Sequence, residues 1–168
     1  MTRALGPLVA VAVFVADQLS KWAVTGPLGI AQSGDVREIV EIFALRFVPN
    51  YGVSLGLLPA EGDTMRWTLV ALTSAIACGV AWWMAKERNR QDVAALGMVL
   101  GGAVGNILDR IRFGYVVDFA DLHFGDFRPF LVFNVADAAI TIGVLILLVR
   151  ALFTRDPKQA ASVENENA

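Results

Sequence analysis

Four long apolar stretches run along the chain, and between them lie shorter polar segments. Each stretch is close to the roughly 20 residues that a helix needs to cross a bilayer. The third stretch ends in a polar turn, and the fourth carries no charge between Asp137 and Arg150. The pattern predicts an all-α membrane protein with four transmembrane helices, over residues 5–24, 65–85, 93–111 and 132–153.

The first stretch also resembles a cleavable signal peptide, because Arg3 precedes an apolar run. Asp17, Gln18 and Lys21 interrupt that run, and the apolar character resumes at Trp22. No convincing small-x-small cleavage site follows. These features favour a helix that is retained.

Lys and Arg in short loops predict the orientation, since they are in excess on the cytoplasmic side. Lys86, Arg88 and Arg90 lie in the short loop between the second and third stretches. Both termini and this loop are therefore expected to face the cytoplasm. Segments 25–64 and 112–131 are expected to face the outside.

The first outer segment contains its own structural signal. Residues 36–48, VREIVEIFALRFV, mix β-branched and aromatic residues with charges, which predicts two short strands at the membrane surface. The tail, residues 156–168, is polar and is expected to be disordered. Residues 1–155 are expected to form a single membrane domain.

Composition supports a membrane protein and argues against nucleic-acid binding, an intrachain disulfide and a zinc site. Hydrophobic residues make up 56% of the chain and the mean hydropathy is +0.57, against roughly 45–50% apolar residues in ordinary globular proteins. A net charge of −2 gives no indication of nucleic-acid binding. One cysteine, Cys78, and one histidine, His123, allow no intrachain disulfide and no zinc site of the usual spacing. The carboxylates could in principle hold a hard cation, but the sequence contains no EF-hand or similar loop. We expect no metal and no other cofactor.

Ionisable residues inside membrane helices are rare and indicate function by default. Asp17 and Lys21 lie four residues apart on the first helix and can pair. Asn106, Asp109 and Arg110 share one face near the outer end of the third helix. For both groups a structural role, as an ion pair or as hydrogen bonds that hold the helix end, stands beside a role in substrate binding.

The third helix also carries Gly97, Gly101 and Gly105, one glycine every four residues. Such spacing allows another helix to approach closely. A non-catalytic membrane scaffold would use this face, and it is one alternative function.

Asp118 lies just outside the third helix between apolar residues, while Asp137 and Asn134 are predicted to share a face of the fourth helix. Alone, each aspartate could be a capping or packing residue. Both map to the outer interface, which suggests a pair that shares one proton. An ionised aspartate can take a proton from water while a protonated one polarises a carbonyl, so such a pair can hydrolyse an amide without a metal.

Other catalytic arrangements find little support. Ser20 and Ser54, the latter within GVSLG at 52–56, have no evident histidine partner, so a serine nucleophile is not supported. A small proton-coupled transporter or channel is the main alternative, with Asp17, Asp109 and Asp137 as a relay. That alternative predicts acidic residues spread through the depth of the bilayer, whereas these cluster toward one face.

Four blocks in order, DQLSK at 17–21, NYGVSLG at 50–56, GGAVGNILDRIRFGYVVDF at 101–119 and FNVADAAITIG at 133–143, together resemble the lipoprotein signal peptidases, or signal peptidase II. The resemblance covers about residues 5 to 153. It implies an intramembrane aspartyl peptidase of the bacterial cytoplasmic membrane. It further implies that a diacylglyceryl-modified prolipoprotein is cleaved just before its lipidated cysteine, and a monomer suffices for this mechanism.

The resemblance also implies a site. Asp118 and Asp137 would be the catalytic pair. Supporting or substrate-binding roles would fall on Asp17, Lys21, Asn50, Gly52, Gly105, Asn106, Asp109, Arg110, Asn134 and Ala136. A small extracytoplasmic β-sheet cradle is implied near 36–48, and a short surface helix near 57–63.

One block departs from the family pattern. The family usually has Asn-Thr-Gly-Ala-Ala-Phe-Gly where this chain has NYGVSLG. Asn50, Gly52 and Gly56 are kept, so the amide and the backbone freedom of the turn remain. The side chains at 51 and 53–55 differ, which changes the shape of the local pocket.

Overall fold

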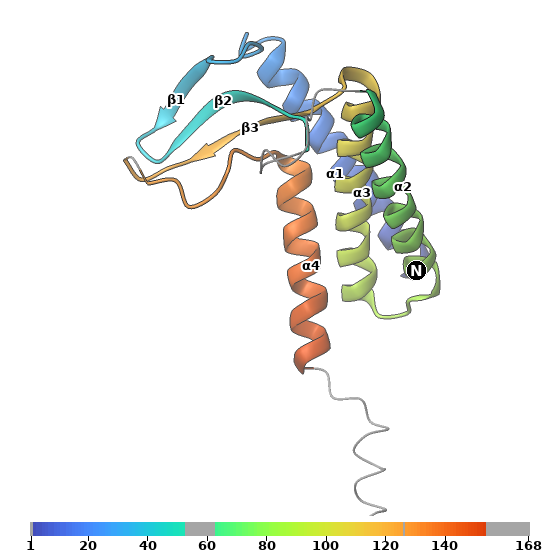
Figure 1. Cartoon of the computed structure of the whole chain (residues 1–168). Coiled ribbons are helices and arrows are strands. Elements are labelled where there is room, and N and C mark those ends of the chain that lie inside the picture. Colours follow the sequence, from blue (N-terminus) through green and yellow to red (C-terminus); the bar gives the residue numbers. More distant parts are fainter. Residues whose placement is uncertain (1, 53–62, 126, 154–168) are drawn as a thin grey trace, which may run out of the picture.

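The computed structural model describes residues 2–52, 63–125 and 127–153, and of residues 2 and 3 it describes only the backbone. Four long helices form a bundle, and a three-stranded sheet lies beyond one end of it (Figure 1). The helices are α1 (Thr2–Thr25), α2 (Asp63–Lys86), α3 (Arg90–Phe113) and α4 (Val135–Phe153). The strands are β1 (Val36–Val40), β2 (Phe43–Asn50) and β3 (Val116–Leu122).

All four predicted membrane helices are present, and each is long and apolar enough to cross a bilayer. The ends of α3 follow from local chemistry. Asn89 caps its start by accepting the N–H groups of Gln91 and Asp92, and Gly114, at φ 87°, ends it in the left-handed conformation. The implied surface helix near 57–63 and the tail predicted to be disordered lie outside the described residues, apart from Asp63, which begins α2.

The fourth helix begins three residues later than predicted, at Val135 rather than at residue 132. The residues before it pair with the sheet instead, because Phe133 forms an antiparallel bridge with Ala120 of β3. Asn134 therefore precedes the helix, and its predicted place inside α4 is wrong, although it does lie beside Asp137 as predicted. The bridge brings the start of α4 beside β3.

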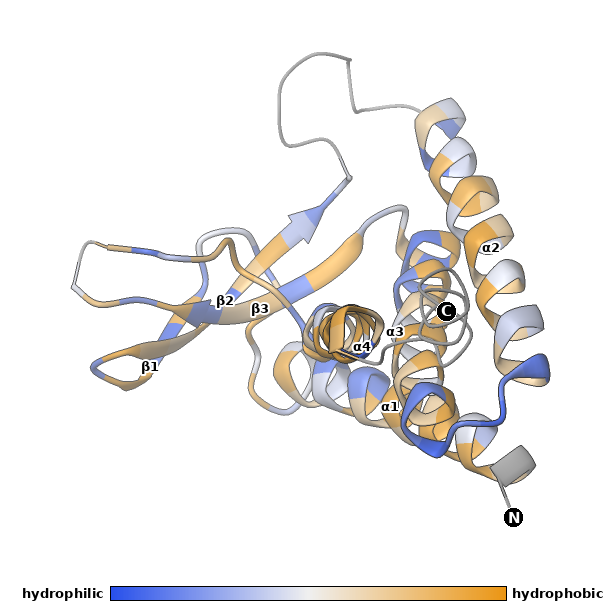
Figure 2. Cartoon of the chain, turned by 90° about the horizontal axis from the view of Figure 1, so that it is seen from below, coloured by the Kyte–Doolittle hydropathy of each residue, from blue (hydrophilic) through white to orange (hydrophobic). Residues whose placement is uncertain are grey.

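Helix α3 is the centre of the bundle and packs against α1, α2 and α4. The predicted close approach at its glycines is confirmed. A Cβ added at Gly97 would lie 2.5 Å from the Gly6 carbonyl oxygen, and one at Gly101 would lie 2.4 Å from that of Ala10. These contacts draw α1 onto α3 at backbone distance. The helices consist largely of hydrophobic residues (Figure 2), and many of their large apolar side chains are exposed, as expected for helices that face lipid.

The sheet is antiparallel in the order β1-β2-β3. The two strands predicted within 36–48 are confirmed as β1 and β2, with β2 extending to Asn50, whereas β3 was not predicted. One face of the sheet packs on the end of α1 and the loop after it, through a core that includes Val24, Ile30 and Phe47. This packing fixes β3, and with it Asp118, above the helix bundle.

Candidate active site

A buried ion network joins α1 to α3 at the sheet end of the bundle. The Lys21 ammonium lies 2.8 Å from Asp17 Oδ2 and 2.7 Å from Asp109 Oδ2. All three side chains are almost fully buried. The pairing of Asp17 with Lys21 predicted from their spacing is confirmed, and Asp109 extends it across to the neighbouring helix. Removing the Lys21 ammonium would leave two buried carboxylates without the cation that they share.

The same network reaches β3 and α4. The backbone N–H of Val117 donates to Asp109 Oδ2 at 3.1 Å, and that of Ala136 donates to Asp17 Oδ1 at 3.0 Å. A Cβ at Gly105 would lie 2.6 Å from Asp17 Oδ2, so a larger residue there would displace this carboxylate. The ion network therefore sets the positions of the segments that carry Asp118 and Asp137.

Asp118 lies on β3 with only 2% of its surface exposed. Its two carboxylate oxygens accept hydrogen bonds from different side-chain amides. Asn134 Nδ2 donates to Oδ1 at 2.6 Å, and Asn50 Nδ2 donates to Oδ2 at 2.9 Å. Both oxygens are thus oriented by groups from outside β3.

Asp137 lies in the first turn of α4 and exchanges hydrogen bonds with Asn134. Asn134 Oδ1 accepts the N–H of Asp137 at 2.9 Å, and Asp137 Oδ2 accepts the N–H of Asn134 at 3.3 Å. This reciprocal arrangement follows the logic of a helix capping box. Asn106 Nδ2 donates to Asp137 Oδ1 at 2.8 Å. Since Asn134 also contacts Asp118, one asparagine holds both carboxylates.

The proximity of the two aspartates has an electrostatic effect. Burial, and then the negative charge of Asp137, raises the pKa of Asp118 from 3.8 to about 7, against the opposing effects of Asn50, Asn134 and Lys21. Near neutral pH, Asp118 therefore retains its proton in a substantial fraction of molecules. Such a pair titrates as a unit and can hold one proton between its members.

Arg110 adds a positive charge to this region. Its guanidinium interacts electrostatically with Asp137, Asp118 and Asp109. Its buried Nε has no hydrogen-bond partner among the described residues. Beside it, the Gly52 N–H donates to Asn50 Oδ1 at 2.8 Å, and Gly52 adopts a φ of 91° that favours glycine.

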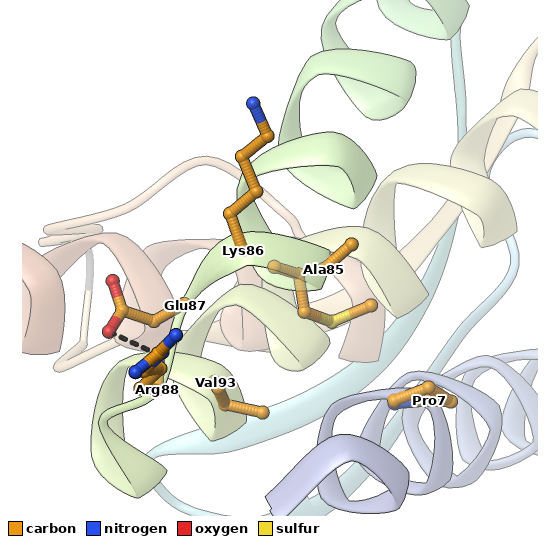
Figure 3. Close-up of a pocket in the computed structure, with 7 residues that line it drawn as sticks. Pro7, Ala85, Lys86, Glu87, Arg88 and Val93 are labelled. Carbon is orange, nitrogen blue, oxygen red and sulfur yellow. Dashed lines mark hydrogen bonds between the residues drawn. The ribbon is translucent and has the colours of Figure 1, made fainter.

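An apolar groove of about 250 Å³ reaches Asp137 at the first turns of α4. It is lined by Phe130, Leu131, Phe133, Asp137, Ala138, Thr141 and Ile142. A larger cavity, of about 850 Å³, lies at the opposite end of the bundle, between α1 and the α2–α3 loop (Figure 3). The acidic residue in its lining is Glu87, which accepts the N–H groups of Arg88 and Asn89. The groove reaches Asp137, and the same asparagine, Asn134, contacts both Asp137 and Asp118. The candidate chemistry therefore lies at the sheet end.

The structure brings the site residues implied by the resemblance to this one end of the molecule. It also reveals a buried aspartate that the sequence did not single out. Asp121 is fully buried and pairs with Arg46 at 3.0 Å and Arg128 at 3.2 Å. Its position three residues after Asp118 was a weak signal, because its two partners lie on other segments.

Comparisons of the sequence with known proteins agree on one family. A sequence model of the signal peptidase (SPase) II family matches residues 9–153. The chain is 57% identical to a lipoprotein signal peptidase of Rhizorhabdus wittichii, over 99% of this chain and 95% of that one. It is 55% identical to one of Sphingopyxis alaskensis, over 88% and 84%. A solved bacterial membrane enzyme superposes with a TM-score of 0.77 at 27% identity, over 89% of this chain and 94% of that one.

Proposed function

The chain belongs to the signal peptidase II family and is a membrane aspartic peptidase, and on that premise we propose its reaction and its catalytic residues. The protein acts as a lipoprotein signal peptidase of the bacterial inner membrane, which it crosses several times. The proposed reaction removes the signal peptide from a diacylglyceryl-modified prolipoprotein by cutting the amide just before the lipidated cysteine. Asp118 and Asp137 are the proposed catalytic pair.

The observation that carries this proposal is the shared support of two neighbouring aspartates. Asp118 on β3 and Asp137 on α4 are both held by Asn134, and the charge of Asp137 contributes to the raised pKa of Asp118. Because one proton can be shared, one aspartate is available as a base while the other is available as an acid. Both roles are needed to hydrolyse an amide.

In the proposed mechanism, a water molecule attacks the scissile carbonyl carbon. The ionised aspartate takes a proton from this water, and the protonated aspartate gives its proton to the carbonyl oxygen, so that a neutral tetrahedral diol forms. In the second step the C–N bond breaks. The newly protonated aspartate donates to the leaving nitrogen, and the other aspartate takes a proton from a diol hydroxyl. The products are a carboxylic acid and an amine, and the pair again holds one proton.

The surrounding residues would support this reaction in two ways. The Asp17–Lys21–Asp109 network positions β3 and α4 through the N–H groups of Val117 and Ala136. The apolar groove beside Asp137 would accept an apolar part of the substrate, so that binding energy remote from the amide helps to place the carbonyl.

We further propose that the termini face the cytoplasm and that the aspartate pair lies near the extracytoplasmic surface. Lys86 at the end of α2, Arg88 in the α2–α3 loop and Arg90 at the start of α3 support this orientation. They lie at the end of the bundle away from the pair. A transporter is less well supported, since the buried acidic side chains among the described residues gather at one end of the bundle.

The test is cleavage of a diacylglyceryl-modified prolipoprotein by the purified protein. Asp118→Asn and Asp137→Asn should each lower cleavage by about 10²–10⁴-fold or more while the proteins remain folded. Asp35→Asn is a matched control, because this carboxylate lies in the loop before the sheet and holds the N–H groups of Ala31 and Gln32. It should cleave normally.

Each outcome bears on a different part of the proposal. Wild-type protein that is inert on a verified substrate would overturn the reaction. Active wild type together with an active, folded Asp118→Asn or Asp137→Asn variant would overturn the catalytic pair alone.

A further inference from the structure

Tyr51 lies just beyond the last paired residue of β2 and packs on an aromatic cluster. Asn50 pairs with Val116 in the β2–β3 register, so the next position along places Tyr51 across from Tyr115. The rings of Tyr51 and Tyr115 make an edge-on contact, with centroids 5.5 Å apart. Tyr115 in turn contacts the rings of Phe47 and Phe113. The ring of Tyr51 thus ties the end of β2 to the turn between α3 and β3.

The neighbouring residue, Asn50, points to the other face of the sheet. Side chains alternate along a strand, so Asn50 lies on the face of Asp118 while Tyr51 lies on the face of Phe47. From there Asn50 Nδ2 reaches Asp118 Oδ2 at 2.9 Å. The position of this amide depends on the backbone at the end of β2, where the Tyr51 ring makes its contact.

The chain turns sharply immediately after this contact. The Gly52 N–H bonds back to Asn50 Oδ1, which fixes the direction of the Asn50 amide. A Cβ at Gly52 would lie 2.4 Å from Leu69 Cδ1 of α2, so the turn is also closely packed on its helix side. The turn after β2 is therefore packed on α2 at Gly52 and on Tyr115 at the Tyr51 ring.

We propose that Tyr51 is a positioning residue that acts through Asn50 on the carboxylate of Asp118. This role rests on the proposed function, because it is measured through peptidase activity. The family pattern has threonine at this position, so the aromatic contact is a feature in which this chain departs from the pattern. Tyr51 is not assigned any contact with the reacting atoms.

The proposal predicts a change in pH dependence as well as in rate. The charged groups around Asp118 are Asp137 on α4, Lys21 on α1, and Arg110 and Asp109 on α3. The hydrogen bond from Asn50 lowers the pKa of Asp118. Losing the ring would loosen Asn50 and weaken that bond. The limb of the pH–activity profile that Asp118 governs should then move to higher pH.

The experiment compares kcat/KM and its pH profile across four variants, with a diacylglyceryl-modified prolipoprotein as substrate. Tyr51→Leu should lower kcat/KM about two- to tenfold, the range expected for loss of one aromatic contact. It should also move the profile in the same direction as Asn50→Ala, by a smaller amount. Tyr51→Phe keeps the ring and should behave as wild type.

The matched control is Phe113→Leu. Phe113 also contacts Tyr115 and is 46% exposed, close to the 45% of Tyr51, yet it lies on α3 and not beside Asn50. This variant should lower thermal stability to a similar extent without moving the pH profile.

A Tyr51→Leu profile that coincides with wild type, or one that moves no more than that of Phe113→Leu, would overturn the positioning role and leave the proposed function intact. Failure of wild type to cleave the substrate would instead count against the proposed function.

Discussion

The close approach of α1 and α3 gives a quantitative prediction for Gly101→Ala. The added Cβ would lie 2.4 Å from the Ala10 carbonyl oxygen and 3.0 Å from its Cα. An ordinary contact begins at 3.4 Å, so the oxygen is too close by 3.4 − 2.4, or about 1 Å. Both neighbouring atoms belong to backbone, so no side chain can rotate away to relieve the clash. The two helices must therefore separate locally.

Overpacking of this kind costs about 1–3 kcal/mol. Replacing a helical glycine by alanine also gives a gain of roughly 0.5–1 kcal/mol from backbone entropy. Gly79→Ala isolates that gain, because Gly79 lies inside α2 and a Cβ there meets nothing within 4 Å. The difference between the two variants therefore measures the helix contact alone.

The assay is thermal unfolding of the purified proteins in the same detergent. Gly101→Ala should unfold at a lower temperature than Gly79→Ala, by about 2–4 °C for each kcal/mol in a chain of this size. Its peptidase activity should also fall, because α3 carries Asn106, which bonds Asp137. Equal unfolding temperatures for the two variants would refute the close packing of α1 on α3.

Four further predictions concern charged residues and metal ions. Asp118→Asn removes a carboxyl whose pKa rises from 3.8 to about 7 on folding. Burying the ionised form costs free energy as pH rises between these values, so the variant should gain thermal stability over wild type from pH 4 to 7 and then keep that gain. A gain independent of pH would contradict the assigned pKa. Lys21→Met should lower the free energy of unfolding by about 3–5 kcal/mol, seen in thermal unfolding, because two buried carboxylates lose their cation. Asp109→Asn should lower the yield of folded protein at least as much as activity, measured by size-exclusion chromatography beside the cleavage assay, because Asp109 binds both Lys21 and the Val117 N–H. EDTA should leave cleavage unchanged, since the described part of the chain holds no group of three or more His, Cys, Asp or Glu side chains placed for a metal ion. Inhibition that a divalent ion reverses would refute the metal-free mechanism.

The sequence predicts well those features that depend on neighbours along the chain. Hydropathy locates the four helices because lipid leaves a membrane chain few other ways to pair its backbone groups. The Asp17–Lys21 pair follows from its four-residue spacing on one helix. Gly97 and Gly101 indicate their role in the same way, since regular spacing places them on one face.

Features that depend on distant segments could not be predicted. Strand β3 is buried along almost its whole length, so it lacks the alternation of polar and apolar residues that reveals a strand. Its partner, β2, comes from a segment before α2. The link from Lys21 to Asp109 likewise spans helices that only the fold brings together. Asn134 was placed inside α4 because nothing local indicates the bridge from Phe133 to Ala120.

The hydrogen bond from Ala136 N to Asp17 Oδ1 has a consequence for how the protein is made. It joins residues 119 positions apart, so α1 is completed by α4, which is synthesised after it. Until α3 and α4 enter the bilayer, Asp17 and Lys21 lack their partners on those helices and keep only contacts within α1, such as their own ion pair. A chain truncated before α4 would keep an unsatisfied polar group on α1. Assembly intermediates should accordingly be recognisable to membrane proteases, and peptidase activity should begin only after the fourth helix has been inserted.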